Sequence, residues 1–170
     1  ILTAFAAPRT HKIYYDEDIY MNIGQNIANL GQTGMCNRGL FIYEEYHCQQ
    51  LEYNKQPNGW PFLIGMFFRI SGANHLGCHV MNNCIFALSI LVVFFMGVIL
   101  FRDEKAGLFG ALIFALTPEG LIWSNTVAAE PSSALFGGLA ILSVILFIRN
   151  PGKATLFLSA VILAFSFQFR

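Results

Sequence analysis

Three consecutive acidic residues stand near the start of the chain, in the segment YYDEDIY that covers residues 14–20. Asp16, Glu17 and Asp18 come where an apolar repeat begins, and acids are favoured in a first helical turn by the helix dipole and as N-caps. They also follow the expected end of a membrane helix. A carboxylate held there could deprotonate an acceptor hydroxyl that arrives from the aqueous side, so these acids are candidates for both capping and catalysis.

Two basic residues could hold a phosphate group. Lys55 precedes a turn rich in Pro and Gly, in the segment NKQPNGWP, and such a turn leaves backbone N–H groups free beside the positive charge. Arg69 stands near the end of the apolar run 60–70 that follows. A lysine that snorkels at the membrane interface is the ordinary alternative for Lys55.

A further acid, Glu130, directly precedes Pro131, and proline favours the first position of a helix. The sequence therefore predicts Glu130 at a helix N-terminus on the outer membrane face. Capping explains an acid at this place, but an ionisable group at the boundary of a membrane is also a candidate functional residue.

Metal and redox chemistry have weaker candidates. His75, Cys78 and His79 share one helical face at the spacing i, i+3 and i+4, which suits metal ligands, although the sequence supplies no fourth ligand. Cys36 and Cys48 fall in one outer loop. An oxidising compartment could pair them, and both could equally be free thiols.

The composition places these residues in a membrane protein. The chain is 55% hydrophobic and 12% charged with a mean hydropathy of +0.54, whereas soluble domains carry about 25% charged residues. The formal net charge is zero, and no run of Lys and Arg alternates with aromatic residues. The sequence therefore lacks the basic surface that a nucleic-acid-binding protein uses to neutralise phosphates. The lipid bilayer is therefore an expected partner, and nucleic acid is not.

Long apolar runs predict an all-α fold, a polytopic transmembrane bundle. Residues 1–7 are expected to end a first transmembrane helix, and residues 76–170 to hold about four more, the last one truncated. The candidate spans are residues 79–101, 106–123 with an end near Pro118, 131–147 and 154–169.

Lys and Arg in short turns set the expected orientation, because they favour the cytoplasmic side. The turns 102–105 and 149–153 each contain two basic residues and would share one side. Residues 8–75 then form an extracytoplasmic loop at the plasma membrane or the endoplasmic reticulum, and the active site is expected on that side.

The outer loop is too polar to cross a membrane. From Asp16 onward, apolar residues repeat about every four positions and predict an amphipathic helix suited to the interface plane, with Ile19, Ile23, Ile27 and Leu30 on its apolar face. Residues 33–55 are expected to be a loop. The run 60–70 is too short to span and predicts an interfacial or re-entrant helix.

The order of these segments resembles the lipid-linked-sugar glycosyltransferases of the GT-C fold. Within them the chain is most similar to the dolichyl-phosphate-mannose protein mannosyltransferase and aminoarabinose transferase group. The likeness rests on the order and spacing of three segments, YYDEDIY, NKQPNGWPFLIGMFFRISG and LIFALTPEGLIWSNTVAAEPSSALFGGLAILSVILF.

The resemblance implies roles for single residues. Asp16 matches the catalytic aspartate of the family's first loop, and Glu17 and Tyr20 match the rest of its DE-x-x-Y pattern. Lys55 matches a lysine that contacts the lipid phosphate of the donor. Glu130 matches a further acid, which would orient the donor or a divalent metal ion as a cofactor.

We therefore expect an inverting membrane glycosyltransferase that moves a sugar from a polyprenyl (dolichyl or undecaprenyl) phosphate to a protein, lipid or glycan acceptor. Asp16 would be the general base, Lys55 and Arg69 would hold the leaving phosphate, and this segment alone is expected to be inactive. A transporter or channel in which Glu119 and Glu130 line a substrate path is an alternative. A non-catalytic scaffold is another.

Overall fold

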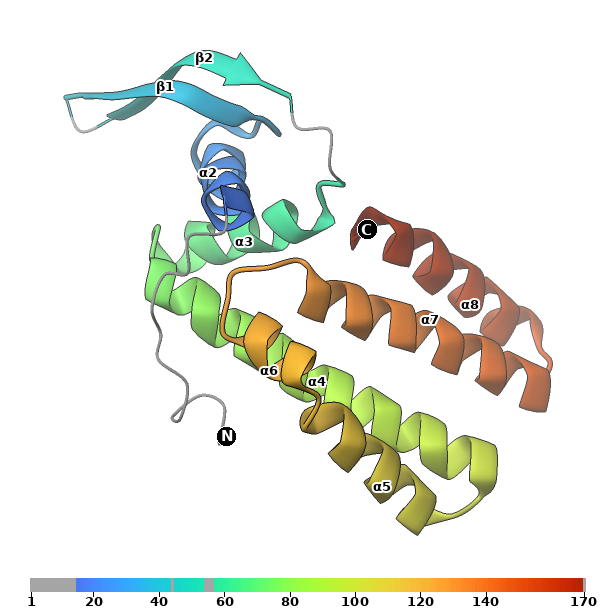
Figure 1. The fold of residues 1–170 in the computed structure, drawn as a ribbon. Coiled ribbons are helices and arrows are strands. Elements are labelled where there is room, and N and C mark those ends of the chain that lie inside the picture. Colours follow the sequence, from blue (N-terminus) through green and yellow to red (C-terminus); the bar gives the residue numbers. More distant parts are fainter. Residues whose placement is uncertain (1–14, 44, 54–56, 170) are drawn as a thin grey trace.

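The computed structural model describes residues 15–43, 45–53 and 57–169 and is mostly helical (Figure 1). The expected end of a first transmembrane helix at residues 1–7 lies outside these ranges. The elements follow in the order α2 (Tyr15–Leu30), β1 (Met35–Ile42), β2 (Glu45–Glu52), α3 (Gly59–Ser71), α4 (His75–Phe101), α5 (Glu104–Ala115), α6 (Pro118–Ser124), α7 (Glu130–Arg149) and α8 (Lys153–Ser166), with a 3-10 turn at Phe167–Phe169.

Two of the predicted spans are helices of sufficient length. Within the described ranges, α4 with 27 residues and α7 with 20 are the helices long and apolar enough to cross a membrane. α4 starts at His75, one turn earlier than predicted, because the Asn74 side chain accepts hydrogen bonds from the N–H groups of Leu76 and Gly77. α4 lies between α5 and α7 in Figure 1.

The predicted span 106–123 is a broken helix. α5 ends at Ala115, α6 begins at Pro118, and the two helices are bent by 64° at the break. Pro118 has no N–H to continue the hydrogen bonding of α5, and it holds Thr117 in an extended conformation. α5 and α6 together could form a third crossing, while α8 and its 3-10 turn form a shorter apolar helix. The described residues therefore hold two or three candidate crossings rather than about four.

The amphipathic helix α2 crosses α3 at two glycines. A Cβ atom on Gly24 would lie 2.5 Å from Ile64, and one on Gly65 would lie 2.8 Å from Ile27, so only glycines allow this approach. Of the predicted apolar face, Ile23 and Ile27 are buried and Ile19 is half-buried, whereas Leu30 at the end of the helix is exposed. That face packs on α3 (Figure 1), and a position in the interface plane stays a prediction.

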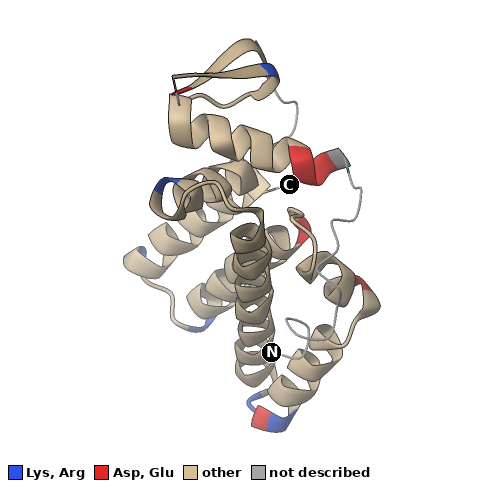
Figure 2. Ribbon diagram, turned by 90° about the vertical axis from the view of Figure 1, so that its left-hand side faces the viewer, with Lys and Arg blue, Asp and Glu red and all other residues tan. Residues whose placement is uncertain are grey.

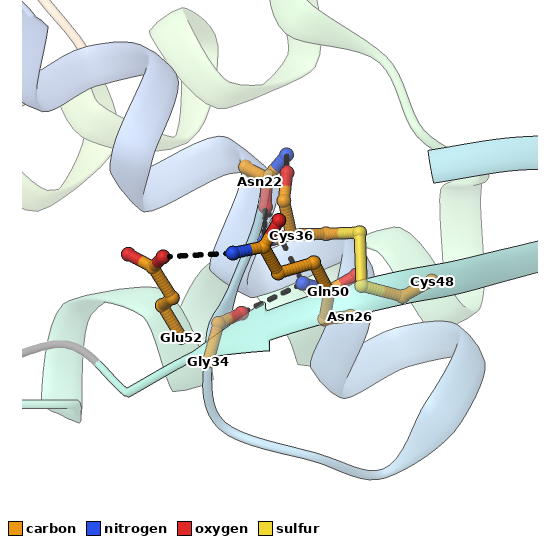
Figure 3. Close-up of a disulfide and its surroundings, with 7 residues drawn as sticks. All are labelled: Asn22, Asn26, Gly34, Cys36, Cys48, Gln50 and Glu52. Carbon is orange, nitrogen blue, oxygen red and sulfur yellow. Dashed lines mark hydrogen bonds between the residues drawn. A yellow bond between two sulfur atoms is a disulfide. The ribbon is translucent and has the colours of Figure 1, made fainter. Parts of the chain in front are cut away.

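The segment between α2 and α3, expected to be a loop, contains an antiparallel hairpin of β1 and β2, so the all-α prediction is wrong at this point. A disulfide joins Cys36 to Cys48, with Cα atoms 5.8 Å apart (Figure 3). α2 holds the hairpin through two amides: Asn22 Oδ1 accepts from the Cys36 N–H at 2.7 Å, and Asn26 Nδ2 donates to the Gly34 carbonyl at 2.6 Å. Both strands are largely exposed, so their sequences lack the apolar alternation that predicts a strand.

The two turns rich in basic residues lie at one end of the molecule, as predicted. The α4–α5 turn and the α7–α8 turn are both at the lower right of Figure 1, and α2, α3 and the hairpin are at the opposite end. Figure 2 shows α4 and α7 without charged residues between their ends. Which end faces the cytoplasm stays a prediction.

Candidate functional site

The three acids at the start of α2 point in different directions, because successive residues of a helix are turned by about 100°. Asp16 is exposed and lines a small pocket. Glu17 is buried, with 2% of its surface exposed. Asp18 is exposed and lines a different pocket. Three adjacent acids that look alike in the sequence therefore have three environments.

The small pocket collects four of the residues that the sequence singled out: Asp16, Glu17, Tyr20 and Glu130. It has a volume of about 40 Å³ and is lined by Asp16, Glu17, Tyr20, Trp123, Ala128 and Glu130. These residues come from α2, α6, the α6–α7 loop and the first residue of α7. The volume admits a water molecule or a hydroxyl group but not a sugar ring, so a larger ligand would have to lie at its mouth.

The α6–α7 loop is fixed by hydrogen bonds from three other elements. Glu17 Oε1 in α2 accepts from the Val127 N–H at 3.1 Å, and Trp60 Nε1 in α3 donates to the Val127 carbonyl at 3.4 Å. Asn82 Nδ2 in α4 donates to the carbonyl of Trp123 at 2.9 Å and to that of Thr126 at 2.5 Å. This loop is buried, and it places Ala128 and Glu130 opposite the start of α2.

Tyr20 contributes a phenol that stays protonated. Burial, followed by the negative charges of Asp16 and Glu130, raises the pKa of Tyr20 to about 12. At neutral pH its hydroxyl is therefore a hydrogen-bond donor beside two carboxylates, which are acceptors. Asp16 and Glu130 both act on this one phenol and line the same pocket, although they lie far apart in the sequence.

Of the two predicted phosphate ligands, Arg69 does not line this pocket. Lys55 lies outside the described residues. Arg69 lies in the last turn of α3, where its Nε donates to the Ala28 carbonyl near the C-terminal end of α2 at 3.3 Å. Ala28 is twelve residues beyond Asp16, which is about 18 Å along the helix. Arg69 thus stabilises the far end of α2, where a positive charge is favoured by the helix dipole.

The predicted metal candidates do not form a metal centre. His75 is exposed, Cys78 and His79 are buried, and the two histidine rings meet edge to face with centroids 5.0 Å apart. Among the described residues, no three His, Cys, Asp or Glu side chains are arranged to hold a metal ion. This holds also for Asp16, Glu17 and Glu130 of the small pocket.

Sequence reasoning missed Trp123, which lines the pocket, and Trp60 and Asn82, which hold the loop. A signal existed for Asn82, because an amide inside an otherwise apolar membrane helix needs a polar partner. The two tryptophans gave no comparable signal, since aromatic residues at a membrane interface are common.

Comparisons of the chain with protein-family models, with curated proteins and with solved structures find no match. A function for this chain therefore rests on the chemistry of the pocket and its place in the fold.

Proposed function

We propose that this chain belongs to a multi-pass membrane glycosyltransferase that moves a sugar from a polyprenyl phosphate to an acceptor hydroxyl on the extracytoplasmic side. The observation that carries the proposal is the convergence of Asp16, Tyr20 and Glu130 on one pocket, at the end of the molecule opposite the basic turns. A base and a hydrogen-bonding partner around a space for one hydroxyl group are what such a transfer requires.

Asp16 is the proposed general base. Its carboxylate is exposed at the pocket, so an acceptor can reach it from the aqueous side. The acceptor oxygen forms a bond to the anomeric carbon while its proton passes to Asp16. The bond between the anomeric carbon and the phosphate oxygen breaks, and its electron pair leaves with the polyprenyl phosphate. Attack and departure occur on opposite faces of the sugar, which inverts the anomeric centre.

The other residues of the pocket position the reactants. In this proposal Glu130 accepts hydrogen bonds from the sugar, and the protonated Tyr20 donates a hydrogen bond to the sugar. Glu17 is buried and holds the Val127 N–H, so we assign it to positioning the loop rather than to proton transfer. Lys55, outside the described residues, is proposed to hold the leaving phosphate, and Lys55→Ala should weaken donor binding.

The test is Asp16→Asn in the full-length protein in membrane vesicles. Loss of a general base lowers a rate about 10²–10⁴-fold, so transfer from a polyprenyl-phosphate sugar should collapse while expression and donor binding persist. Glu104→Gln is the matched control. Glu104 is an exposed acid in the first turn of α5, at the opposite end, so it loses a similar dipole interaction of about 0.3–1 kcal/mol without touching the pocket. Full transfer activity in Asp16→Asn would refute the assignment.

One observation favours a second candidate, a transporter. The break between α5 and α6 makes a discontinuous membrane helix, a feature that transporters use to bind substrates, and Glu119 is exposed in the first turn of α6. A transporter would move solute across sealed vesicles, and Glu119→Gln would stop the flux while Asp16→Asn would leave it intact. The glycosyltransferase proposal predicts the opposite: Asp16→Asn should stop sugar transfer, and Glu119→Gln should leave it intact.

A further inference from the structure

A second pocket lies between the C-terminal half of α2 and the β1–β2 hairpin (Figure 1). This space, the hairpin pocket, has a volume of about 820 Å³, within the range of about 300–1,000 Å³ that is typical of small-molecule sites. It shares no lining residue with the small Asp16–Glu130 pocket. Its polar and aromatic lining residues are Gln25 and Asn29 of α2 and Phe41, Glu45, Tyr46 and His47 of the hairpin.

The α2 side of the pocket carries two amides that the fold does not engage. α2 has four amide side chains, and two of them, Asn22 and Asn26, hold the hairpin through hydrogen bonds. The other two, Gln25 and Asn29, line the hairpin pocket one helical turn apart, and within the described part of the chain neither hydrogen-bonds another residue. Each amide offers N–H donors and a carbonyl acceptor. Two such groups one turn apart can bind neighbouring hydroxyl groups of one ligand.

The hairpin side of the pocket is aromatic. The ring of Tyr46 lies over Gly39, where a Cβ atom would come within 2.8 Å of the ring, so the glycine gives the ring room against β1. Phe41 stands beside Tyr46 with ring centroids 5.4 Å apart and planes at 53°. Tyr46 is half-buried, and Phe41 is 69% exposed. The two tilted rings give the pocket an aromatic corner.

This combination of groups favours a neutral saccharide. The face of an aromatic ring carries partial negative charge, which attracts the C–H groups of a sugar ring. Sugar hydroxyl groups both donate and accept, so they suit amides as well as the exposed side chains of Glu45 and His47.

Other ligand classes fit the lining less well. No Lys or Arg is among the described lining residues, so a phosphate or carboxylate group would meet no basic partner there, and Glu45 would repel it. A purely apolar ligand would cover Gln25 and Asn29 and leave their amides without hydrogen bonds, which costs free energy.

We infer that the hairpin pocket binds a neutral glycan, with a sugar ring against Tyr46 and its hydroxyl groups hydrogen-bonded to Gln25 and Asn29. Gln25 is nine residues beyond Asp16, which is about 14 Å along α2. The hairpin pocket is therefore a second site, and the inference does not depend on the proposed sugar transfer.

The test applies the full-length protein in detergent micelles, which leave every face accessible, to an array of immobilised neutral and sialylated glycans with unglycosylated peptides beside them. We expect binding to a subset of the neutral glycans. The Kd is then measured by titration with the soluble form of the neutral oligosaccharide that binds best. Binding to no glycan, binding to sialylated glycans alone, or equal binding to the peptides would overturn the inference.

A tyrosine pair tests the aromatic contact. Tyr46→Ala removes the ring at the centre of the pocket and should raise the Kd about tenfold or more. Tyr53→Ala is the matched control, because Tyr53 follows β2 and is 81% exposed but does not line the pocket. A Kd that is unchanged in Tyr46→Ala, or raised equally in Tyr53→Ala, would contradict a site at this place.

An amide pair keeps the test decisive if the loss of Tyr46 disturbs the hairpin. Asn29 is exposed on α2 and holds no other element, so Asn29→Ala should leave the fold intact and raise the Kd about 3–10-fold, the effect of one hydrogen bond. Gln32→Ala is the control, an exposed amide just beyond α2 that does not line the pocket. Equal values of Kd for the two variants would overturn the inference. Because binding is measured without a sugar donor, failure here leaves the enzymatic proposal standing.

Discussion

At the scale of single residues, the acids of α2 differ in what surrounds them. Asp16 is exposed at the small pocket, Glu17 is buried against a backbone N–H, and Asp18 lines the pocket beside α4. A base must exchange protons with a substrate, so only an accessible carboxylate can serve. This divides one acidic cluster into a proposed base, a proposed positioning residue and an acid at a separate pocket.

The role of Glu17 can be separated from that of Asp16 by two substitutions. Glu17→Gln keeps an oxygen that accepts from the Val127 N–H, so stability and sugar transfer should stay near those of the wild type. Glu17→Ala leaves that buried N–H without its partner and should cost about 1–3 kcal/mol of unfolding free energy. Unfolding in detergent and the separate kcat and KM of transfer are the measurements. A Glu17→Gln protein of normal stability that transfers as poorly as Asp16→Asn would make Glu17 the base.

The raised pKa of Tyr20 predicts an alkaline loss of stability. Below pH 10.0 the phenol is protonated in both states; from there to about 12 it ionises in the unfolded chain but not in the folded one. The unfolded state then binds fewer protons, so stability falls as pH rises through this range. Tyr20→Phe should flatten that part of the profile, measured as unfolding midpoints from neutral pH to about pH 11. Parallel profiles for the two proteins would contradict the assignment.

At the scale of elements, the structure departs from the sequence prediction where local signals are weak. The hairpin strands have no buried face to impose alternation and are held by Cys36–Cys48 and by amides of α2. The proline at position 118 indicated a break in the helix. Whether such a break ends a membrane span or only bends it depends on packing with neighbouring helices. Long apolar helices such as α4 are predicted well, because a run of that length has few other stable conformations in a membrane.

The hairpin should behave as a unit that depends on its disulfide. Replacing Cys36 and Cys48 by serine removes a cross-link that typically contributes about 2–4 kcal/mol. Backbone amides of β1 and β2 should then exchange hydrogen faster, while those of α4 and α7 keep their protection, as measured by hydrogen-exchange mass spectrometry. Asn26→Ala, which removes the bond to the Gly34 carbonyl with the disulfide intact, should loosen the hairpin less. Equal acceleration in α4 would show that the hairpin is not a separate unit.

At the scale of the whole molecule, the fold separates two ends. The basic turns are at one end, and the candidate pocket and the disulfide are at the other. A structural disulfide is favoured in an oxidising compartment, which agrees with an extracytoplasmic position for that end. The Lys and Arg bias of the turns independently predicts the same orientation.

This orientation can be tested in sealed vesicles of known sidedness with the full-length protein. After reduction by a membrane-impermeant agent from the extracytoplasmic side, Cys36 and Cys48 should react with an impermeant maleimide added on that side. In a Lys105→Cys variant, the new thiol should react only from the cytoplasmic side. The opposite pattern would reverse the topology and remove the proposed active site from the compartment of its acceptor.

The sequence by itself determined the apolar helices, the amphipathic face of α2 and the shared end of the basic turns, because these depend on short-range periodicity and composition. It also singled out Asp16, Tyr20 and Glu130 as candidates. Only the tertiary structure decided that these three meet while Arg69 does not, since their meeting depends on how α2 crosses α3 and on the loop held by Glu17, Trp60 and Asn82. Contacts between residues more than a hundred positions apart are set by packing, and packing leaves no local trace in the order of amino acids.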